Sequence, residues 1–417
     1  MGEKVYVLGS YCMPFRRWPE KSLKDLTRDA YLGVLADAGL KTGSDIAAAW
    51  FGNCFAYYWG QSCIRGNVCF IPLVREGLFP ERIPITNVEA GCATASFAMA
   101  GAYKEIKAGD ADLTLAIGVE KMFDPNDPAA VFPLFSSGLD QQNPEEWMAH
   151  YQEVAASMGK TFAPQPGGSI AMDTYAIQAL YHMQRYGTTV EQIAAGAAKN
   201  HCNGALNPNA QYRFAMTTQQ VLDDRLVSDP FTRSMCAPIG DGAAAALLCS
   251  ERYLKAQPDE VQKRAVLIRG FGLAGGKYRQ LDEPGLTRHA ADRAYAMAGI
   301  GPQQINVAEV HDATSFCEIY QAEMLRFCEP GEGGRFVGSG ATSLTGSLPI
   351  NTSGGLVSKG HPIGATGLSM CYELVTQLRG EAGARQVKDA IFALEENGGG
   401  VIGMEEAVAA VVIYERV

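Results

Sequence analysis

The residue most suited to covalent chemistry is Cys92, which lies among small side chains in the segment GCATAS, residues 91–96. We expect a helix over Gly91–Gly109, so that Cys92 stands at its N-terminus. Free amide N–H groups and positive potential there favour a thiolate and lower the pKa of a cysteine. Small neighbours also let a substrate approach. The segment therefore indicates a nucleophile, although a cysteine packed in a tight helix would show the same pattern.

Two histidines are suited to act with such a thiol. His361 lies in GHPIGATG, residues 360–367, where glycines and a proline at the first helical turn place the imidazole at a helix start. Histidine is the usual base that activates a thiol. His311 ends the apolar strand expected at Val307–Val310, and the carboxyl end of a strand is where α/β proteins place function. A structural role in a local turn is the alternative for His311.

Two glycine-rich segments follow predicted strands. Residues 395–400 read EENGGG, and the bare N–H groups of such a turn can form an oxyanion hole, with a plain tight turn as the alternative. Residues 270–275 read GFGLAG, which fits the dinucleotide-binding fingerprint. No apolar helix follows to place a pyrophosphate, so we do not expect NAD binding there.

The elements that position these residues alternate between strand and helix, which indicates an α/β protein with mostly parallel sheets. Strands are expected at Val5–Gly9, Ile46–Gly52, Leu113–Val119, Ala244–Cys249, Ala265–Gly270, Ala308–His311, Ile391–Ala393 and Ala407–Tyr414. The chain also carries a faint repeat, because GCATAS and GHPIGATG each open a helix that an apolar strand follows. Two such halves predict a duplicated fold with one active site between them.

The segment from residue 121 to 235 breaks this alternation. It is rich in proline and polar residues, and we interpret it as an inserted, loop-rich subdomain that carries binding surface. The N-terminal half is then expected at residues 1–120 plus 236–262, and the C-terminal half at residues 263–417.

Composition excludes several classes of function. The 417 residues include 35 Lys+Arg and 45 Asp+Glu, and a net charge of −10 argues against nucleic-acid binding. No run approaches the roughly 20 apolar residues of a membrane-spanning helix, and no signal peptide is evident, so we expect a cytoplasmic protein with reduced thiols. The 11 cysteines form no Cys-x-x-Cys pair, so no metal site is expected in this chain.

The Cys92 segment and the GHPIGATG motif together resemble the thiolase superfamily, over nearly the whole chain. The sequence DGAAAA at residues 241–246 and the triple-glycine turn agree with this resemblance. HDAT at residues 311–314 is similar to the His-Asp-x-Phe motif of the sterol-carrier-protein-type and archaeal branch, where conventional thiolases have Asn-Glu-Ala-Phe. The resemblance implies a five-layer α-β-α-β-α fold, usually dimeric, in which the insertion binds coenzyme A.

The resemblance also implies roles for the motif residues. Cys92 would take the acyl group, His361 would activate it and donate to the thioester oxygen, and His311 would replace an asparagine that holds a water in the first oxyanion hole. The other implied site residues are the amides of Cys92 and of Gly398 or Gly399 in the second oxyanion hole, and Ala313 and Gly360 against coenzyme A.

One departure concerns the second cysteine that conventional thiolases carry before the triple-glycine turn, where it moves the proton at the substrate α-carbon. This chain has Glu396-Asn397 there, and it has Ala313 where some sterol-carrier-type members place that cysteine. A Cys–His–His set therefore replaces Cys–His–Cys. We hypothesise that His311 handles the α-proton, with Glu396 and the adjoining Asn397 as weaker alternatives, and Cys317 as the least favoured.

These expectations describe a thiolase that cleaves a 3-oxoacyl-CoA with coenzyme A as second substrate. The branch favours a branched, aromatic or steroid-derived acyl chain, for example a benzoylsuccinyl group. Aromatic residues that could line its pocket are Phe55, Tyr57, Tyr58, Trp59, Phe132, Phe135 and Trp147. The alternatives are a retro-aldol lyase of the sterol side-chain type, a ketosynthase, or a non-catalytic scaffold subunit. Expected partners are acyl-CoA and CoA, a second copy of the chain, and a small zinc-ribbon/OB-fold subunit.

Overall fold

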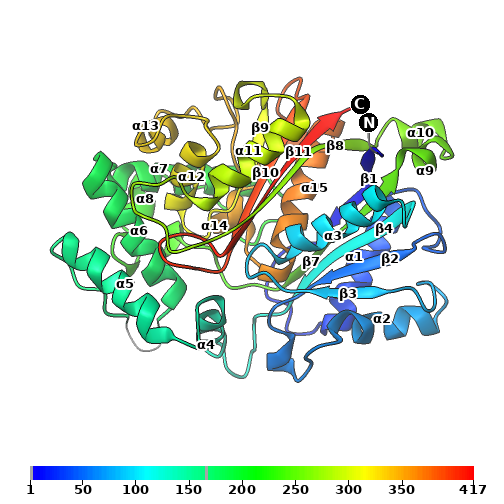
Figure 1. Cartoon of the computed structure of the whole chain (residues 1–417), viewed down its shortest axis with the longest axis horizontal. Helices are drawn as coiled ribbons and strands as arrows, with labels where there is room; N and C mark the ends of the chain where they lie inside the picture. Colours follow the sequence, from blue (N-terminus) through cyan, green and yellow to red (C-terminus); the bar gives the residue numbers. More distant parts are fainter. Residues whose placement is uncertain (1–2, 165–167) are drawn as a thin grey trace.

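Two groups of strands form the centre of the protein, which a computed structural model describes for residues 3–164 and 168–417 (Figure 1). The first group has the order β3 (Ile85–Val88), β2 (Ala48–Gly52), β4 (Leu113–Glu120), β7 (Gly242–Ser250) and β1 (Val5–Cys12). The second has the order β9 (Val307–Val310), β10 (Phe392–Gly399), β11 (Val408–Arg416) and β8 (Val266–Gly275). Short pairing between β1 and β8 joins them into one hydrogen-bonded series.

The two groups repeat the same pairing pattern, as the sequence repeat predicts. In the first group β2 and β4 are parallel, while β4–β7 and β7–β1 are antiparallel. In the second, β9 and β10 are parallel, while β10–β11 and β11–β8 are antiparallel. The counterpart of edge strand β3 is reduced to a single parallel bridge between Ile350 and Ala308. The duplicated fold is therefore confirmed.

The expectation of mostly parallel sheets is wrong, because most of these pairings are antiparallel. The error has a physical reason. Strand β7 is buried along its whole length and β11 along most of it, since helices cover both faces of each sheet. Apolar side chains on both faces are typical of parallel strands, so the sequence pattern does not reveal the direction.

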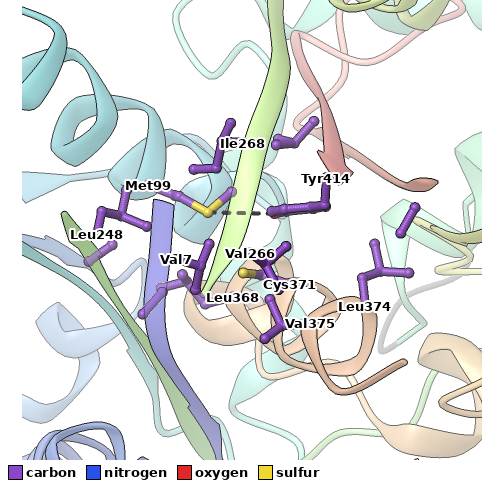
Figure 2. Packing of buried hydrophobic residues seen from close by; sticks show 14 of the residues in the cluster. Val7, Met99, Leu248, Val266, Ile268, Leu368, Cys371, Leu374, Val375 and Tyr414 are labelled. Carbon is purple, nitrogen blue, oxygen red and sulfur yellow. Dashed lines mark hydrogen bonds between the residues drawn. The ribbon is translucent and has the colours of Figure 1, made fainter. Parts of the chain in front are cut away.

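Helices α3 (Thr94–Ala108) and α15 (Thr366–Arg379) lie between the two groups of strands, and their side chains form the central core with those of β1, β7, β8 and β11. Figure 2 shows this packing, where Met99 of α3 and Leu368 of α15 meet strand residues such as Val7 and Tyr414. Helices α1 (Leu23–Asp37) and α2 (Arg65–Arg75) cover the outer face of the first group, and α11 (Leu286–Ala298) covers that of the second. The layers therefore run α-β-α-β-α.

The small residues of α3 have a packing function as well as a place in the site. A Cβ on Gly367 of α15 would lie 2.7 Å from the backbone nitrogen of Ser96 in α3, closer than real Cβ contacts. The two central helices can therefore cross only where both carry minimal side chains. Because α3 and α15 each begin beside a motif residue, this crossing brings the two motifs together.

The segment between β4 and β7 is more helical than the loop-rich subdomain expected from the sequence. It comprises α4 (Val131–Leu134), α5 (Pro144–Ser157), α6 (Ile170–Tyr186), α7 (Val190–Ala205), α8 (Thr218–Leu222) and the hairpin of β5 (Leu226–Ser228) and β6 (Phe231–Thr232). Helix α7 packs on α12 (Ser315–Met324), α13 (Gly333–Gly338) and α14 (Gly355–Lys359) of the second half. In Figure 1 this segment lies to one side of the strands.

The remaining elements are short. They are α9 (Glu251–Lys255), α10 (Asp259–Gln262) and the 3-10 helices at Ala56–Trp59, Phe135–Gly138, Arg233–Met235, Pro302–Gln304, Ile363–Ala365 and Gly383–Arg385. The GFGLAG segment lies within β8, where a Cβ on Gly272 would meet the backbone of Ala290 in α11. Those glycines therefore serve strand–helix contact. Among the described residues, no helix is both long and apolar enough to cross a membrane.

Candidate active site

Cys92 lies in a tight turn just before α3, two residues ahead of its first residue, Thr94. The Thr94 hydroxyl accepts a hydrogen bond from the Ala90 N–H (2.8 Å) and donates one to the Gly91 carbonyl (2.6 Å), which fixes the turn. Gly91 has φ +54°, and a Cβ there would lie 2.6 Å from the backbone nitrogen of Gly400. Only glycine therefore lets the nucleophile turn approach the triple-glycine turn.

His361 faces the thiol directly. Its Nε2 lies 3.2 Å from Cys92 Sγ, and its Nδ1 lies 2.7 Å from the Thr366 hydroxyl oxygen. That hydroxyl donates its own hydrogen to the Pro362 carbonyl, so it accepts from the His361 Nδ1–H. The proton is therefore held on Nδ1, and the lone pair of Nε2 is directed at the thiol. The sequence predicted this base, but the acceptor Thr366 escaped notice.

His311 completes a compact trio. The ligand atoms of Cys92, His311 and His361 all lie within 4.8 Å of one another, and the two imidazole rings meet edge to face with centroids 5.3 Å apart. His311 is fully buried, yet neither of its ring nitrogens has a hydrogen-bond partner among residues 3–164 and 168–417. Buried polar atoms are normally paired. These two nitrogens are therefore free to contact a substrate or a water molecule.

Burial controls the protonation of the trio. It raises the pKa of the Cys92 thiol to about 12, although hydrogen bonds from the N–H groups of Cys92 itself and of Gly400 oppose the rise. Burial also lowers the pKa of His311 to about 4 and that of His361 well below its usual value. The helix N-terminus does not produce the low thiol pKa that we expected, because desolvation outweighs it. The resting pair is a neutral thiol donating to a neutral imidazole.

Two buried carboxyl groups hold the backbone around His311. Glu396 accepts a hydrogen bond from the His311 N–H (3.0 Å) and one from the Thr287 hydroxyl (3.2 Å). Asp312 accepts from the Leu356 N–H (2.6 Å) at the start of α14. Asp312 thereby ties the His311 segment to the helix that leads into His361. Glu396 and Asn397 are not among the residues that line the cavity described below.

Glu120, at the end of β4, is a residue that sequence reasoning missed. Its carboxyl group accepts hydrogen bonds from the N–H groups of Cys54 (2.9 Å), Phe55 (3.1 Å) and Gly364 (3.1 Å). Burial raises its pKa to about 7. It therefore joins the segment after β2 to the GHPIGATG loop. A carboxylate that ends an otherwise apolar strand is the signal that could have revealed it.

The triple-glycine turn contacts the nucleophile through its last two residues. A Cβ on Gly399 would lie 2.9 Å from the Cys92 nitrogen, and the Gly400 N–H lies close enough to the thiol to lower its pKa. Gly398 instead faces Glu406, whose Cγ a Cβ would approach to 2.6 Å. Within this turn the Gly400 N–H thus acts on the Cys92 thiol, and the oxyanion-hole roles expected for the Gly398 and Gly399 amides stay predictions.

A cavity of about 320 Å³ opens beside Cys92 and His361. Most of its lining is apolar or backbone, and it includes Phe55, Phe135, Leu139, Met172, Tyr175, Ala313 and Ile363. No Lys or Arg belongs to the lining formed by residues 3–164 and 168–417. Of the aromatic residues proposed from the sequence, only Phe55 and Phe135 line it, while Trp147 packs in a separate core. Ala313 lines the cavity; Gly360 does not.

Gly360 has a conformational role instead. Its φ of +109° is one that residues with a side chain rarely adopt, and a Cβ would lie 3.1 Å from Gln211 Oε1. It turns the chain from α14 into His361.

Comparison with known proteins assigns the chain. Residues 5–225 match the family model "Thiolase, N-terminal domain", and residues 280–415 match "Thiolase C-terminal domain-like". The chain belongs to the thiolase family. Acetyl-CoA acetyltransferase of Methanothermobacter thermautotrophicus is 37% identical over 417 residues, covering 99% of both chains. Sterol carrier protein 2 of Bos taurus is 34% identical, covering 96% of this chain and 71% of its own. The family and its sterol-carrier and archaeal relatives are thus as predicted, and the protein is an acyltransferase.

Solved structures share the fold. "Ltp2-ChsH2(DUF35) aldolase" superposes with a TM-score of 0.77 at 20% identity, covering 99% of this chain and 98% of the other. The Acat5 thiolase of Ascaris suum, in complex with coenzyme A, gives a TM-score of 0.64 at 15% identity, covering 99% and 100%. The thiolase fold is therefore confirmed over essentially the whole chain.

Proposed function

We propose that the protein is a thiolase that cleaves a 3-oxoacyl-CoA by acyl transfer to Cys92. One observation carries this proposal: Cys92 Sγ lies 3.2 Å from His361 Nε2 at the wall of an apolar cavity, with the His361 tautomer fixed by Thr366. A thiol whose proton has an acceptor in place can attack a carbonyl as it loses that proton. The activity of the 37% identical relative, named acetyl-CoA acetyltransferase, supports the same chemistry.

In the proposed reaction, the sulfur of Cys92 bonds to the 3-oxo carbon while its proton passes to His361 Nε2. The bond between C2 and C3 then breaks, and its electron pair becomes the enolate of the departing acyl-CoA. The proton that His361 took up is relayed to the adjacent His311, whose ring lies 5.3 Å away between centroids, and His311 delivers it to that α-carbon, so that both imidazoles end neutral. The thiol of a second coenzyme A attacks the acyl-enzyme and releases the shortened acyl-CoA, with its proton restoring Cys92. The amides of Cys92 and Gly400 stabilise the oxyanion on the Cys92-bound carbon.

The test is covalent capture. Incubation with acyl-CoAs should add one acyl mass to Cys92 by intact-protein mass spectrometry, and Cys92→Ala should abolish the adduct. Cys54→Ser is the matched control, because Cys54 also lines the cavity but hydrogen-bonds to Thr94 and not to a histidine. No adduct and no thiolysis across linear, branched and aromatic substrates would refute the proposal. Full carbon–carbon cleavage by Cys92→Ala would favour a retro-aldol lyase instead.

The acyl group is proposed to be branched or aromatic, in keeping with the benzoylsuccinyl type expected from the sequence. Phe55 and Phe135 pack edge to face at 5.8 Å between ring centroids and form one wall of the cavity. Aromatic groups pack well against such edges. The ratio of kcat/KM for an aromatic 3-oxoacyl-CoA to kcat/KM for acetoacetyl-CoA measures this preference. Phe135→Ala should lower this ratio.

Partners follow from two features. The described lining carries no cation to meet the phosphates of coenzyme A, which supports a small zinc-ribbon/OB-fold subunit as the source of that contact. Within the part of the chain that the structure describes, edge strand β3 pairs only with β2, which supports a homodimer formed along this edge. We place the assembly in the cytoplasm. Light scattering of the purified chain gives its stoichiometry, and zinc analysis of the co-purified complex reveals the partner. A zinc-free dimer with full turnover would make the partner unnecessary.

A further inference from the structure

One side chain in the wall of the cavity has an unused hydrogen-bond donor. Helix α6 of the inserted segment contributes Ala171, Met172 and Tyr175 to the lining. Tyr175 is only 7% exposed, yet its hydroxyl makes no hydrogen bond to any residue in the described part of the chain. A tyrosine hydroxyl in a buried position normally finds a partner. This donor is therefore available to a molecule in the cavity.

The surroundings of the ring place this donor on the His311 side of the cavity. Tyr175 packs in one apolar cluster with Ala313, Phe316 and Cys317, and Ala313 follows His311 by two residues. A methyl group at position 313 leaves space that a larger side chain would fill. The phenol thus lies beside the segment that carries His311, in a cavity that Cys92 also lines.

The hydroxyl can donate but cannot act as a base. Burial raises the pKa of Tyr175 well above its usual value, and the neighbouring Cys317, Cys92 and Glu406 raise it further. The phenol therefore keeps its proton throughout the working pH range. A neutral donor in a site with little water stabilises negative charge more strongly than the same donor in water.

We propose that Tyr175 is a further catalytic residue, whose hydroxyl donates a hydrogen bond to the thioester oxygen of the acyl-CoA that departs as an enolate. This inference rests on the proposed thiolase reaction. When the C2–C3 bond breaks, negative charge develops on that oxygen, so a donor held there binds the transition state more tightly than the substrate. His311 handles the proton at the α-carbon, while Tyr175 stabilises the charge on the neighbouring oxygen. The Cys92 and Gly400 amides serve the other oxyanion, on the carbon bonded to Cys92.

The test separates the two half-reactions in Tyr175→Phe, which keeps the ring and removes only the hydroxyl. Exchange of the α-protons of acetyl-CoA in D₂O, followed by mass spectrometry, reports enolate formation. Loss of one oxyanion donor should slow this exchange by about 10²-fold. The rate at which an acyl-CoA thioester acylates Cys92 should stay unchanged, because that step forms no enolate and uses the amides of the other oxyanion hole.

Tyr151→Phe is the matched control. Tyr151 is fully buried in the same inserted segment, but its hydroxyl accepts from Gln178 and does not line the cavity. Normal exchange in Tyr175→Phe would overturn the inference, as would an equal loss in both variants or a parallel loss of adduct formation. Failure of the proposed function is distinguishable, because the wild-type protein would then show neither adduct nor exchange.

Discussion

Replacing Thr366 by valine removes the group that fixes the His361 tautomer while keeping the shape of the side chain. The His361 Nδ1–H donates to Thr366 over 2.7 Å, and both groups are buried. Without that acceptor, a buried donor is left unpaired, which costs about 1–3 kcal/mol. The imidazole avoids this unpaired donor by carrying its proton on Nε2 instead of Nδ1. In that tautomer Nε2 can no longer accept the hydrogen bond from the Cys92 thiol. Since about 1.4 kcal/mol corresponds to a factor of ten, acylation should slow by about 5- to 140-fold.

The assay is the single-turnover rate of acyl-adduct formation on Cys92, read by quenched mass spectrometry. Thr366→Ser restores the hydroxyl and should recover most of the rate. We expect kcat to fall and KM to change little, because Thr366 does not line the cavity. A Thr366→Val variant with the wild-type rate would refute the tautomer argument. A Thr366→Ser variant as slow as Thr366→Val would show that packing, and not the hydrogen bond, sets the rate.

Three further predictions follow from the same site. Burial lowers the pKa of His311 to about 4 in the native state. In the unfolded chain the same histidine binds its proton near pH 6.5, its ordinary pKa. The free energy of unfolding should thus fall by about 2 kcal/mol between pH 7 and pH 5 through this residue, and His311→Asn should lose that part in denaturant titrations. Gly399→Ala should slow acylation at least tenfold, because its Cβ would lie 2.9 Å from the Cys92 nitrogen, whereas Gly275→Ala, with open space around it, should not. Added Zn²⁺ should inhibit thiolysis by binding the trio of Cys92, His311 and His361. EDTA should leave thiolysis by the isolated chain unchanged. A higher rate with added zinc, or a lower rate with EDTA, would contradict this prediction.

The reactive residues could be found in the sequence because their neighbours are unusual. Glycines and small residues around Cys92 and His361 mark places where backbone approaches backbone, and in the structure Gly91 and Gly400 meet there. The repeat of a motif, a helix and a strand was also sufficient for the duplicated fold. The direction of the strands could not be predicted from the sequence. Strand β7 is covered on both faces, and its apolar pattern does not reveal that it pairs in antiparallel fashion.

The supporting groups could not be found this way, because each acts on a residue far along the chain. Glu120 accepts from Gly364, which is 244 residues later in the sequence. In the sequence Tyr175 is one more apolar residue on α6, and only the fold shows that it lines the cavity and that its hydroxyl has no hydrogen-bond partner in the described chain. Hydrogen-bond partners depend on distance in space, which a local pattern does not encode.

The sequence by itself determined which atoms can react: a thiol and two imidazoles, each in a segment whose glycines set its local conformation. Tertiary structure decided their protonation and their roles. The helix start at Cys92 suggested a thiolate, but desolvation of the assembled site raises the pKa of that thiol to about 12 and keeps both imidazoles neutral. Desolvation depends on everything that packs around a group, so it arises only when two halves of the chain and the inserted segment close over the site.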